Sequence, residues 1–101
     1  MLEIGMNIDN DVLTVSLNGK LDGMTFQEFE EQLESQREQA NKIIIDAAGL
    51  EYVSSAGLRV IMSTELYMEK SGKEKITIKN LSDEVREIIE LCGFDQVIEM
   101  E

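Results

Sequence analysis

Residues 43–60 constrain the fold of this chain most, because the spacing of the apolar residues changes there from that of a strand to that of a helix. Three consecutive isoleucines at positions 43–45 stand between charged residues, as in a strand covered on both faces. The apolar residues from Leu58 onward recur with helical spacing. Residues 54–57, Ser-Ser-Ala-Gly, are therefore predicted to form a short loop between a buried strand and a helix.

Two adjacent serines, Ser54 and Ser55, stand where this helix begins. The first turn of a helix has unpaired backbone N–H groups and a partial positive charge. In the simplest interpretation a serine at this position caps the helix. It can also present its hydroxyl to solvent, where the helix end would stabilise an attached phosphoryl group. Ala56 and Gly57 keep the segment narrow, so that a partner's active site could approach closely, and Gly57 can equally serve tight packing of the helix on the sheet.

Alternating apolar residues predict the strands before and after this region. Residues 2–8 and 12–17 are predicted to form a β-hairpin around residues 9–11, Asp-Asn-Asp, and residues 18–19, Asn-Gly, to end its second strand. Further strands are expected at residues 42–46, 75–80 and 97–100.

Three helices are predicted between these strands. Thr25 and Glu28 have the spacing of a capping box, and the helix that they open is expected to end at residue 39 or 40. The second helix follows the serines and stops at residues 71–72, and the third opens at Ser82 and is closed by Gly93. The order β-β-α-β-α-β-α-β predicts a single α/β domain over residues 1–101, with a mixed, largely parallel sheet and helices packed against it.

The charge balance limits the partners of this chain. Its formal net charge of -12, from 9 basic and 21 acidic residues, argues against binding to nucleic acid or to an anionic membrane surface, and it suits a partner with a basic docking face. The single cysteine, Cys92, excludes an intramolecular disulfide, and its place on an apolar helical stripe predicts burial. Because the apolar runs are too short to span a bilayer and residues 1–6 lack the features of a signal peptide, we expect a cytoplasmic location.

Histidine is absent from the sequence, and this absence limits the catalytic chemistry. A Ser-His-Asp triad is impossible, and one cysteine without histidine does not make a structural zinc site. Residues 9–11 resemble the opening of a calcium loop, but the required glycine and the terminal glutamate are missing. A phosphate-binding loop that ends in Gly-Lys-Ser/Thr is also missing. We therefore expect no enzymatic activity, no metal and no cofactor.

The sequence of residues 46–60 resembles the signature of STAS domains, and in particular that of bacterial anti-sigma factor antagonists. It contains a strand-ending Asp, a short spacer, an aromatic-apolar pair and then Ser-Ser-Ala-Gly-Leu-Arg-Val. Residues 19–22, Gly-Lys-Leu-Asp, are similar to the family's Gly-x-Leu-Asp after the second strand. Residues 81–85 and 91–94 are similar to the family's last helix and its closing turn, so that the resemblance covers nearly the whole chain.

The resemblance implies a partner switch. In that family the domain binds an anti-sigma factor that is also an ATP-dependent serine kinase, and this binding frees the sigma factor. The kinase phosphorylates the serine two residues before the motif glycine, which is Ser55 here; phosphorylation abolishes binding, and a serine phosphatase restores it. The resemblance further implies a monomer when free, and a partner-binding surface formed by Asp22, Gly23, Met24, Ser54, Ser55, Ala56, Gly57, Leu58 and Arg59.

Two positions depart from the family pattern. Many members have Asp immediately before the phosphoacceptor, where this chain has Ser54, and Ser or Thr before the glycine, where it has Ala56. Ala56 removes a competing hydroxyl, whereas Ser54 adds one beside Ser55. Two other interpretations stay open: a STAS domain that is never phosphorylated and serves as a scaffold or a transporter-complex subunit, and a module that binds a small ligand or a nucleotide at the same helix N-terminus.

Overall fold

A five-stranded sheet forms the body of the protein in a computed structural model that describes residues 2–101. The strands lie in the order β1 (Leu2–Asp9), β2 (Val12–Leu21), β3 (Lys42–Val53), β4 (Thr77–Lys79) and β5 (Glu99–Met100). β1 is antiparallel to β2, and every other pair of neighbours is parallel. The prediction of a mixed, largely parallel sheet is therefore confirmed.

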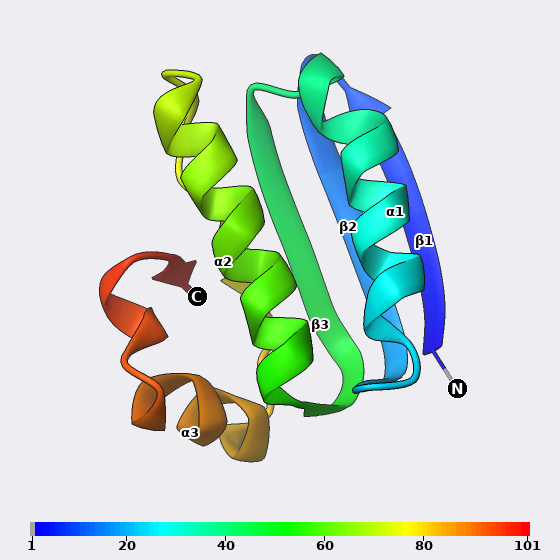
Figure 1. The fold of residues 1–101 in the computed structure, drawn as a ribbon, viewed down its shortest axis with the longest axis vertical. Coiled ribbons are helices and arrows are strands. Elements are labelled where there is room, and N and C mark those ends of the chain that lie inside the picture. The colour runs from blue at the N-terminus through cyan, green and yellow to red at the C-terminus, as the bar shows by residue number, and fades with distance from the viewer. Residues whose placement is uncertain (1) are drawn as a thin grey trace.

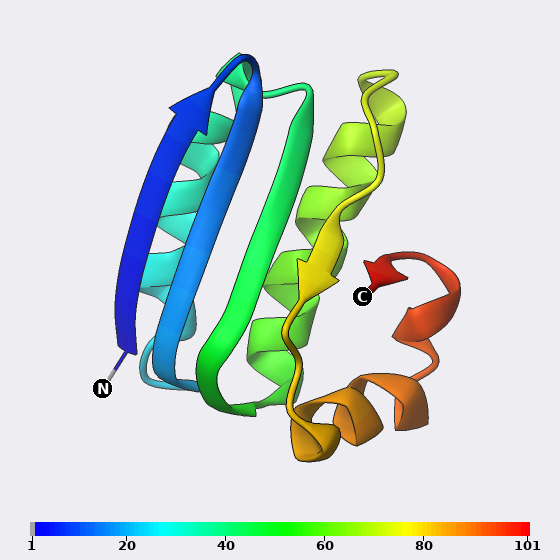
Figure 2. The same cartoon turned by 180° about the vertical axis from the view of Figure 1, so that it is seen from behind.

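Helices α1 (Phe26–Gln36) and α2 (Ser55–Lys70) run side by side over one face of the sheet (Figure 1). The short helix α3 (Asp83–Leu91) lies at the lower end of the molecule in this view, and the 3-10 turns η1 (Arg37–Gln39) and η2 (Phe94–Gln96) follow α1 and α3. Figure 2 shows the opposite face of the sheet, which α1 and α2 leave open. The predicted order of strands and helices is confirmed.

The core lies between the sheet and helices α1 and α2. Because side chains alternate along a strand, one side of β2 and of β3 faces these helices, through Leu13, Val15, Leu17, Ile43 and Ile45. They pack in one cluster with Phe29 and Leu33 of α1 and with Leu58 and Ile61 of α2. The expectation that β3 is covered on both faces is wrong, since Ile44 on the open face is only half-buried.

Several boundaries differ from those predicted: the last two strands are shorter, as β4 and β5, and three other elements change as follows. β3 continues to Val53, so that no loop precedes α2: Ser54 is the N-cap, and residues 56–57 belong to the first helical turn. β2 continues through residues 18–19 to Leu21, because its pairing with β3 resumes after a register shift on either side of this Asn-Gly pair. α1 ends at Gln36, and the rest of the predicted helix is the 3-10 turn η1.

The capping box predicted at the start of α1 does not form. Thr25 is at the N-cap, but its hydroxyl makes no capping hydrogen bond to the first turn. Thr25 Oγ1 instead donates to the carbonyl oxygen of Lys20 over 2.9 Å and accepts from the Asp22 N–H, also over 2.9 Å. The threonine therefore ties the helix start back to the end of β2.

The end of α3 differs from the prediction in one residue. Cys92, predicted to be buried, is exposed, because it is the C-cap residue beyond the buried stripe of Val85 and Ile89. Gly93 follows with a φ of 77°, the left-handed conformation expected of a glycine that closes a helix.

The turn predicted at residues 9–11 is confirmed. Asn10 and Asp11 have φ values of 52° and 65°, which suit the tight turn of a two-residue hairpin.

Within residues 2–101, no group of three or more His, Cys, Asp or Glu side chains is arranged to hold a metal ion. In the same part of the chain, no helix has the length and apolar character needed to cross a membrane.

Tyr67 of α2 contacts two cationic side chains. The guanidinium carbon of Arg37 is 4.1 Å from the centre of the ring, and the Lys73 Nζ is 5.3 Å from it. Lys73 Nζ also donates to the carbonyl oxygens of Arg37 and Glu38 over 3.0 and 3.1 Å. The cluster therefore ties the end of α2 to the turn that follows α1.

Tyr67→Leu should lower the free energy of unfolding by about 1 kcal/mol, because leucine keeps apolar contact but loses the ring face that attracts the two cations. Urea denaturation measures this change. Tyr52→Leu is the matched control, since Tyr52 is 44% exposed, and it should change the free energy by less than about 0.5 kcal/mol. Equal losses in the two variants would contradict this role of Tyr67.

Candidate functional site

The two segments that the sequence marked as functional, residues 22–24 and 54–59, lie next to each other at the carboxyl ends of β2 and β3. Leu21 and Val53 are register partners in the sheet. The Ser54 N–H then donates to the carbonyl oxygen of Leu21 over 2.8 Å, which extends the pairing by one residue after β3 ends. The β2–α1 and β3–α2 connections thus form one edge, at the lower end of the sheet in Figure 1.

Ser54 caps α2. Its backbone is extended, with φ of -92° and ψ of 172°, and its Oγ accepts a hydrogen bond from the Gly57 N–H over 3.4 Å. Its carbonyl oxygen accepts from the Leu58 N–H over 2.9 Å. The Ser54 hydroxyl is thus engaged in the cap, and the side chain is half-buried.

Ser55 is the first residue of α2, and it is exposed. Because Ser54 occupies the cap position, the helix does not need the Ser55 hydroxyl to close its first turn. The two interpretations of the serine pair therefore each apply to one residue: Ser54 caps the helix, and Ser55 faces solvent. The helix end beside Ser55 carries a partial positive charge, which suits an added negative group.

Gly57 is buried against the end of β2. A Cβ at this position would lie 2.5 Å from Leu21 Cγ and 3.2 Å from the Leu21 carbonyl oxygen. Leu21 is fully buried and cannot move aside without disturbing the core. Of the two explanations for a small residue here, tight packing of the helix on the sheet is the one that the geometry favours. Leu58 is only 1% exposed and belongs to the core, so that neither residue offers surface to a partner.

Gly57→Ala should lower the free energy of unfolding by about 1–3 kcal/mol, the usual cost of adding a methyl group to a packed site, although alanine is the better helix former. Urea denaturation is the measurement. Gly23→Ala is the control, because no atom lies within 4 Å of the Cβ it would gain, and it should change stability by less than about 0.5 kcal/mol. A Gly57→Ala protein as stable as the parent would show that α2 can shift away from Leu21.

Asp22 organises the β2–α1 connection. Its Oδ1 accepts from the Met24 N–H over 2.9 Å and lies 3.2 Å from Thr25 Oγ1. The hydrogen bond from the Met24 N–H is the main cause that lowers the pKa of the Asp22 carboxyl below its ordinary value. Gly23 is exposed, and Met24 projects from this loop with 95% of its surface exposed.

Asp46, the acidic residue of the motif, lies within β3 and not at its end. Its Oδ1 accepts from Asn80 Nδ2 over 3.0 Å and from the Ala48 N–H over 3.1 Å. These hydrogen bonds, with that of Asn80 the stronger cause, lower the pKa of the Asp46 carboxyl. Because Asn80 directly follows β4, Asp46 joins two strands and has a structural role.

The exposed side of α2 continues from Ser55 along the helix. Arg59 is exposed, Met62 is half-buried and Leu66 is 50% exposed. We call these four residues the α2 stripe, because positions 55, 59, 62 and 66 have the spacing of one helix face. Sequence reasoning did not single out Met62 or Leu66 as surface residues. The spacing from Ser55 was the signal that could have found them.

The surface of residues 2–101 includes two open hollows of similar size. One of about 420 Å³ lies beside the site and is lined by Leu2, Asp22, Met24, Thr25 and Glu28. The other, of about 410 Å³, adjoins the far half of α2 and is lined by Glu65, Glu69, Lys73, Lys75, Gln96 and Val97. Because neither is lined by Ser54 or Ser55, the hollows lend no support to a small-ligand site at the start of α2.

Comparison with known proteins agrees with this architecture. BtrV of Bordetella bronchiseptica, a proposed anti-sigma factor antagonist, is 27% identical over 94 residues, which are 92% of this chain and 80% of BtrV. The anti-sigma F factor antagonist of Paenibacillus polymyxa is 26% identical over 99 residues, which are 96% of this chain and 84% of that protein. The Bacillus cell fate determinant SpoIIAA, solved in its phosphorylated form, has a TM-score of 0.74 at 14% identity and shows the same fold over 100% of this chain and 91% of its own.

A family model described as "Mlab, STAS domain" matches residues 4–99. The chain therefore belongs to the STAS domain family.

Proposed function

We propose that this protein is an anti-sigma factor antagonist that is switched by phosphorylation of Ser55. Unphosphorylated, it binds an anti-sigma factor that is also a serine kinase, and the sigma factor is released. Phosphorylation ends this binding, and a serine phosphatase restores it. The observation that carries the proposal is the division of roles between the serines, since Ser54 caps α2 and leaves Ser55 exposed at the edge of the sheet.

The reaction requires only an accessible hydroxyl from this chain. Ser55 Oγ would attack the γ-phosphorus of ATP held by the kinase. An O–P bond forms, the bond from the γ-phosphorus to the bridging oxygen breaks with release of ADP, and the hydroxyl proton passes to a base of the kinase or to water. The chain then acts as a substrate and a binding module, in line with a family that is typically non-enzymatic. SpoIIAA, which shares this fold, has itself been solved in a phosphorylated form.

The surface around Ser55, formed by the α2 stripe and Met24, is the proposed docking surface. Its composition explains why a phosphoryl group would act as a switch. Ser55 begins the α2 stripe and shares its edge with the exposed Met24. Phosphorylation adds about -1.5 to -2 charge. At a contact that includes Met24, Met62 and Leu66, this charge would lose water, and unless the partner places a cation there, that loss opposes binding.

The proposed partners are the kinase and the phosphatase. The net charge of -12 favours a basic docking face on such a partner and opposes contact with nucleic acid or an anionic membrane. Since the kinase uses ATP and, as an anti-sigma factor, binds a sigma factor, we place the free protein in the cytoplasm. We propose that it is a monomer.

Incubation with the cognate anti-sigma kinase and ATP should add one phosphoryl group to the protein, on Ser55. Intact-mass and fragment spectra locate it. Ser55→Ala should abolish the mass gain. Ser54→Ala is the neighbouring control: it should keep the mass gain and lower stability by about 1 kcal/mol, because the cap is lost.

A phosphoryl group found mainly on Ser54 would contradict the assignment. Tight binding to a kinase without any transfer would instead favour the scaffold or transporter-complex alternative. Saturable binding of ATP to the isolated domain, abolished by Ser55→Ala, would favour the nucleotide-binding alternative.

A further inference from the structure

We propose that Arg59 pairs with the phosphoryl group of phosphorylated Ser55. Phosphorylation would then change the docking surface at two positions, because it adds charge at Ser55 and withdraws Arg59 from the partner. This inference rests on the proposed phosphorylation of Ser55, and it names the residue of this chain that would form an ion pair with the phosphoryl group.

The geometry of α2 brings the two side chains together. Ser55 and Arg59 are four residues apart on the same helix, and both are exposed. Residues with this spacing are neighbours on a helix surface, with Cβ atoms about 5–6 Å apart. Because helical side chains lean toward the N-terminus, the Arg59 side chain can reach the turn that begins with Ser55. An acidic group that precedes a basic one at this spacing is also the more favourable order.

Arg59 has no competing acid at these spacings within α2. The residues three or four positions from it, besides Ser55, are Ala56, Met62 and Ser63. The first acidic residue of the helix is Glu65, which is buried and whose Oε1 accepts from the Ile76 N–H over 2.8 Å. The guanidinium is therefore available to a new negative group at Ser55.

Several charged residues at this edge of the sheet, together with Arg59, would influence the second pKa of a phosphoryl group on Ser55. The element ends here carry the cations Lys20 and Lys79, at the ends of β2 and β4, and the connections and first helical turns carry the acids Asp22, Glu28, Glu51, Asp83 and Glu84. These acids oppose the doubly ionised phosphoryl group and raise its second pKa, whereas Arg59 and the start of α2 lower it. A guanidinium can form two parallel hydrogen bonds with phosphate oxygens, which a lysine cannot do.

The test uses the full chain with phosphoserine introduced at position 55 during translation, so that no kinase is involved. A pH titration followed by phosphorus NMR measures the second pKa of the phosphoryl group. Arg59→Gln should raise this pKa by about 0.3 unit, the size expected for an i, i+4 ion pair. Arg59→Lys should restore part of the shift, because it keeps the charge but loses the fork of donors.

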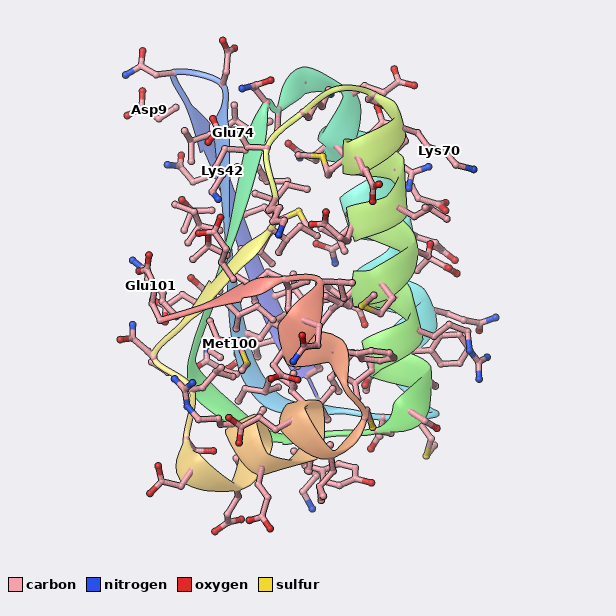
Figure 3. The ribbon with its side chains drawn as sticks, turned by 90° about the vertical axis from the view of Figure 1, so that its left-hand side faces the viewer. Asp9, Lys42, Lys70, Glu74, Met100 and Glu101 are labelled. Atoms are coloured by element: carbon pink, nitrogen blue, oxygen red, sulfur yellow. The ribbon has the colours of Figure 1, made fainter. Side chains whose placement is uncertain are left out.

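Lys70→Gln is the matched control, since it removes the same charge from the other end of α2. Figure 3 shows Lys70 projecting away from the helix, and it lies about 22 Å along the helix axis from Ser55, well beyond the Debye length of about 8 Å. This variant should change the pKa by less than about 0.1 unit.

Equal pKa values for the phosphorylated parent and its Arg59→Gln variant would overturn the inference, and so would equal shifts from Arg59→Gln and Lys70→Gln. Either result leaves the proposed function intact. The proposed function fails separately, if the cognate kinase does not modify Ser55.

Discussion

The contact between the start of α2 and the end of β2 determines how the candidate site is built. Leu21 makes this contact twice: its carbonyl oxygen accepts from the Ser54 N–H over 2.8 Å, and its side chain fills the space that Gly57 leaves free. Because Leu21 ends β2, the contact fixes the first turn of α2 beside the loop that leads to α1. The exposed Ser55 and the exposed Met24 therefore belong to one edge that the sheet holds in place, and a partner can contact both.

The position of each serine relative to the helix explains the departure from the family pattern. Ser54 is the N-cap, and serine and aspartate are about equally good at this position, because each offers a side-chain oxygen to the N–H groups of the first turn. Ser54 can thus replace the common Asp as a cap without placing a negative charge beside Ser55. The second hydroxyl is engaged with the Gly57 N–H, so that it competes less as a phosphoacceptor than the sequence suggests.

The order of the elements could be predicted because the local signals were strong, above all the change of spacing after residues 43–45. The boundaries depended on partners distant in sequence. β2 passes through residues 18–19 because β3 continues to pair with it, and this pairing overrides the turn preference of Asn-Gly. In the same way, the motif identified Ser55 as a candidate phosphoacceptor. It could not show that Leu58 is buried and that Leu66 is half exposed, because these exposures depend on how α2 packs on the sheet.

The affinity of the anti-sigma partner for the two forms of this protein tests the central claim most directly. Calorimetry would compare unphosphorylated protein with protein phosphorylated at Ser55, at one ionic strength, with circular dichroism showing that both are folded. The account predicts that phosphorylation weakens binding at least about tenfold, which corresponds to about 1.4 kcal/mol, and leaves the dichroism spectrum unchanged. Equal affinities for the two folded forms would contradict the claim that Ser55 is the switch.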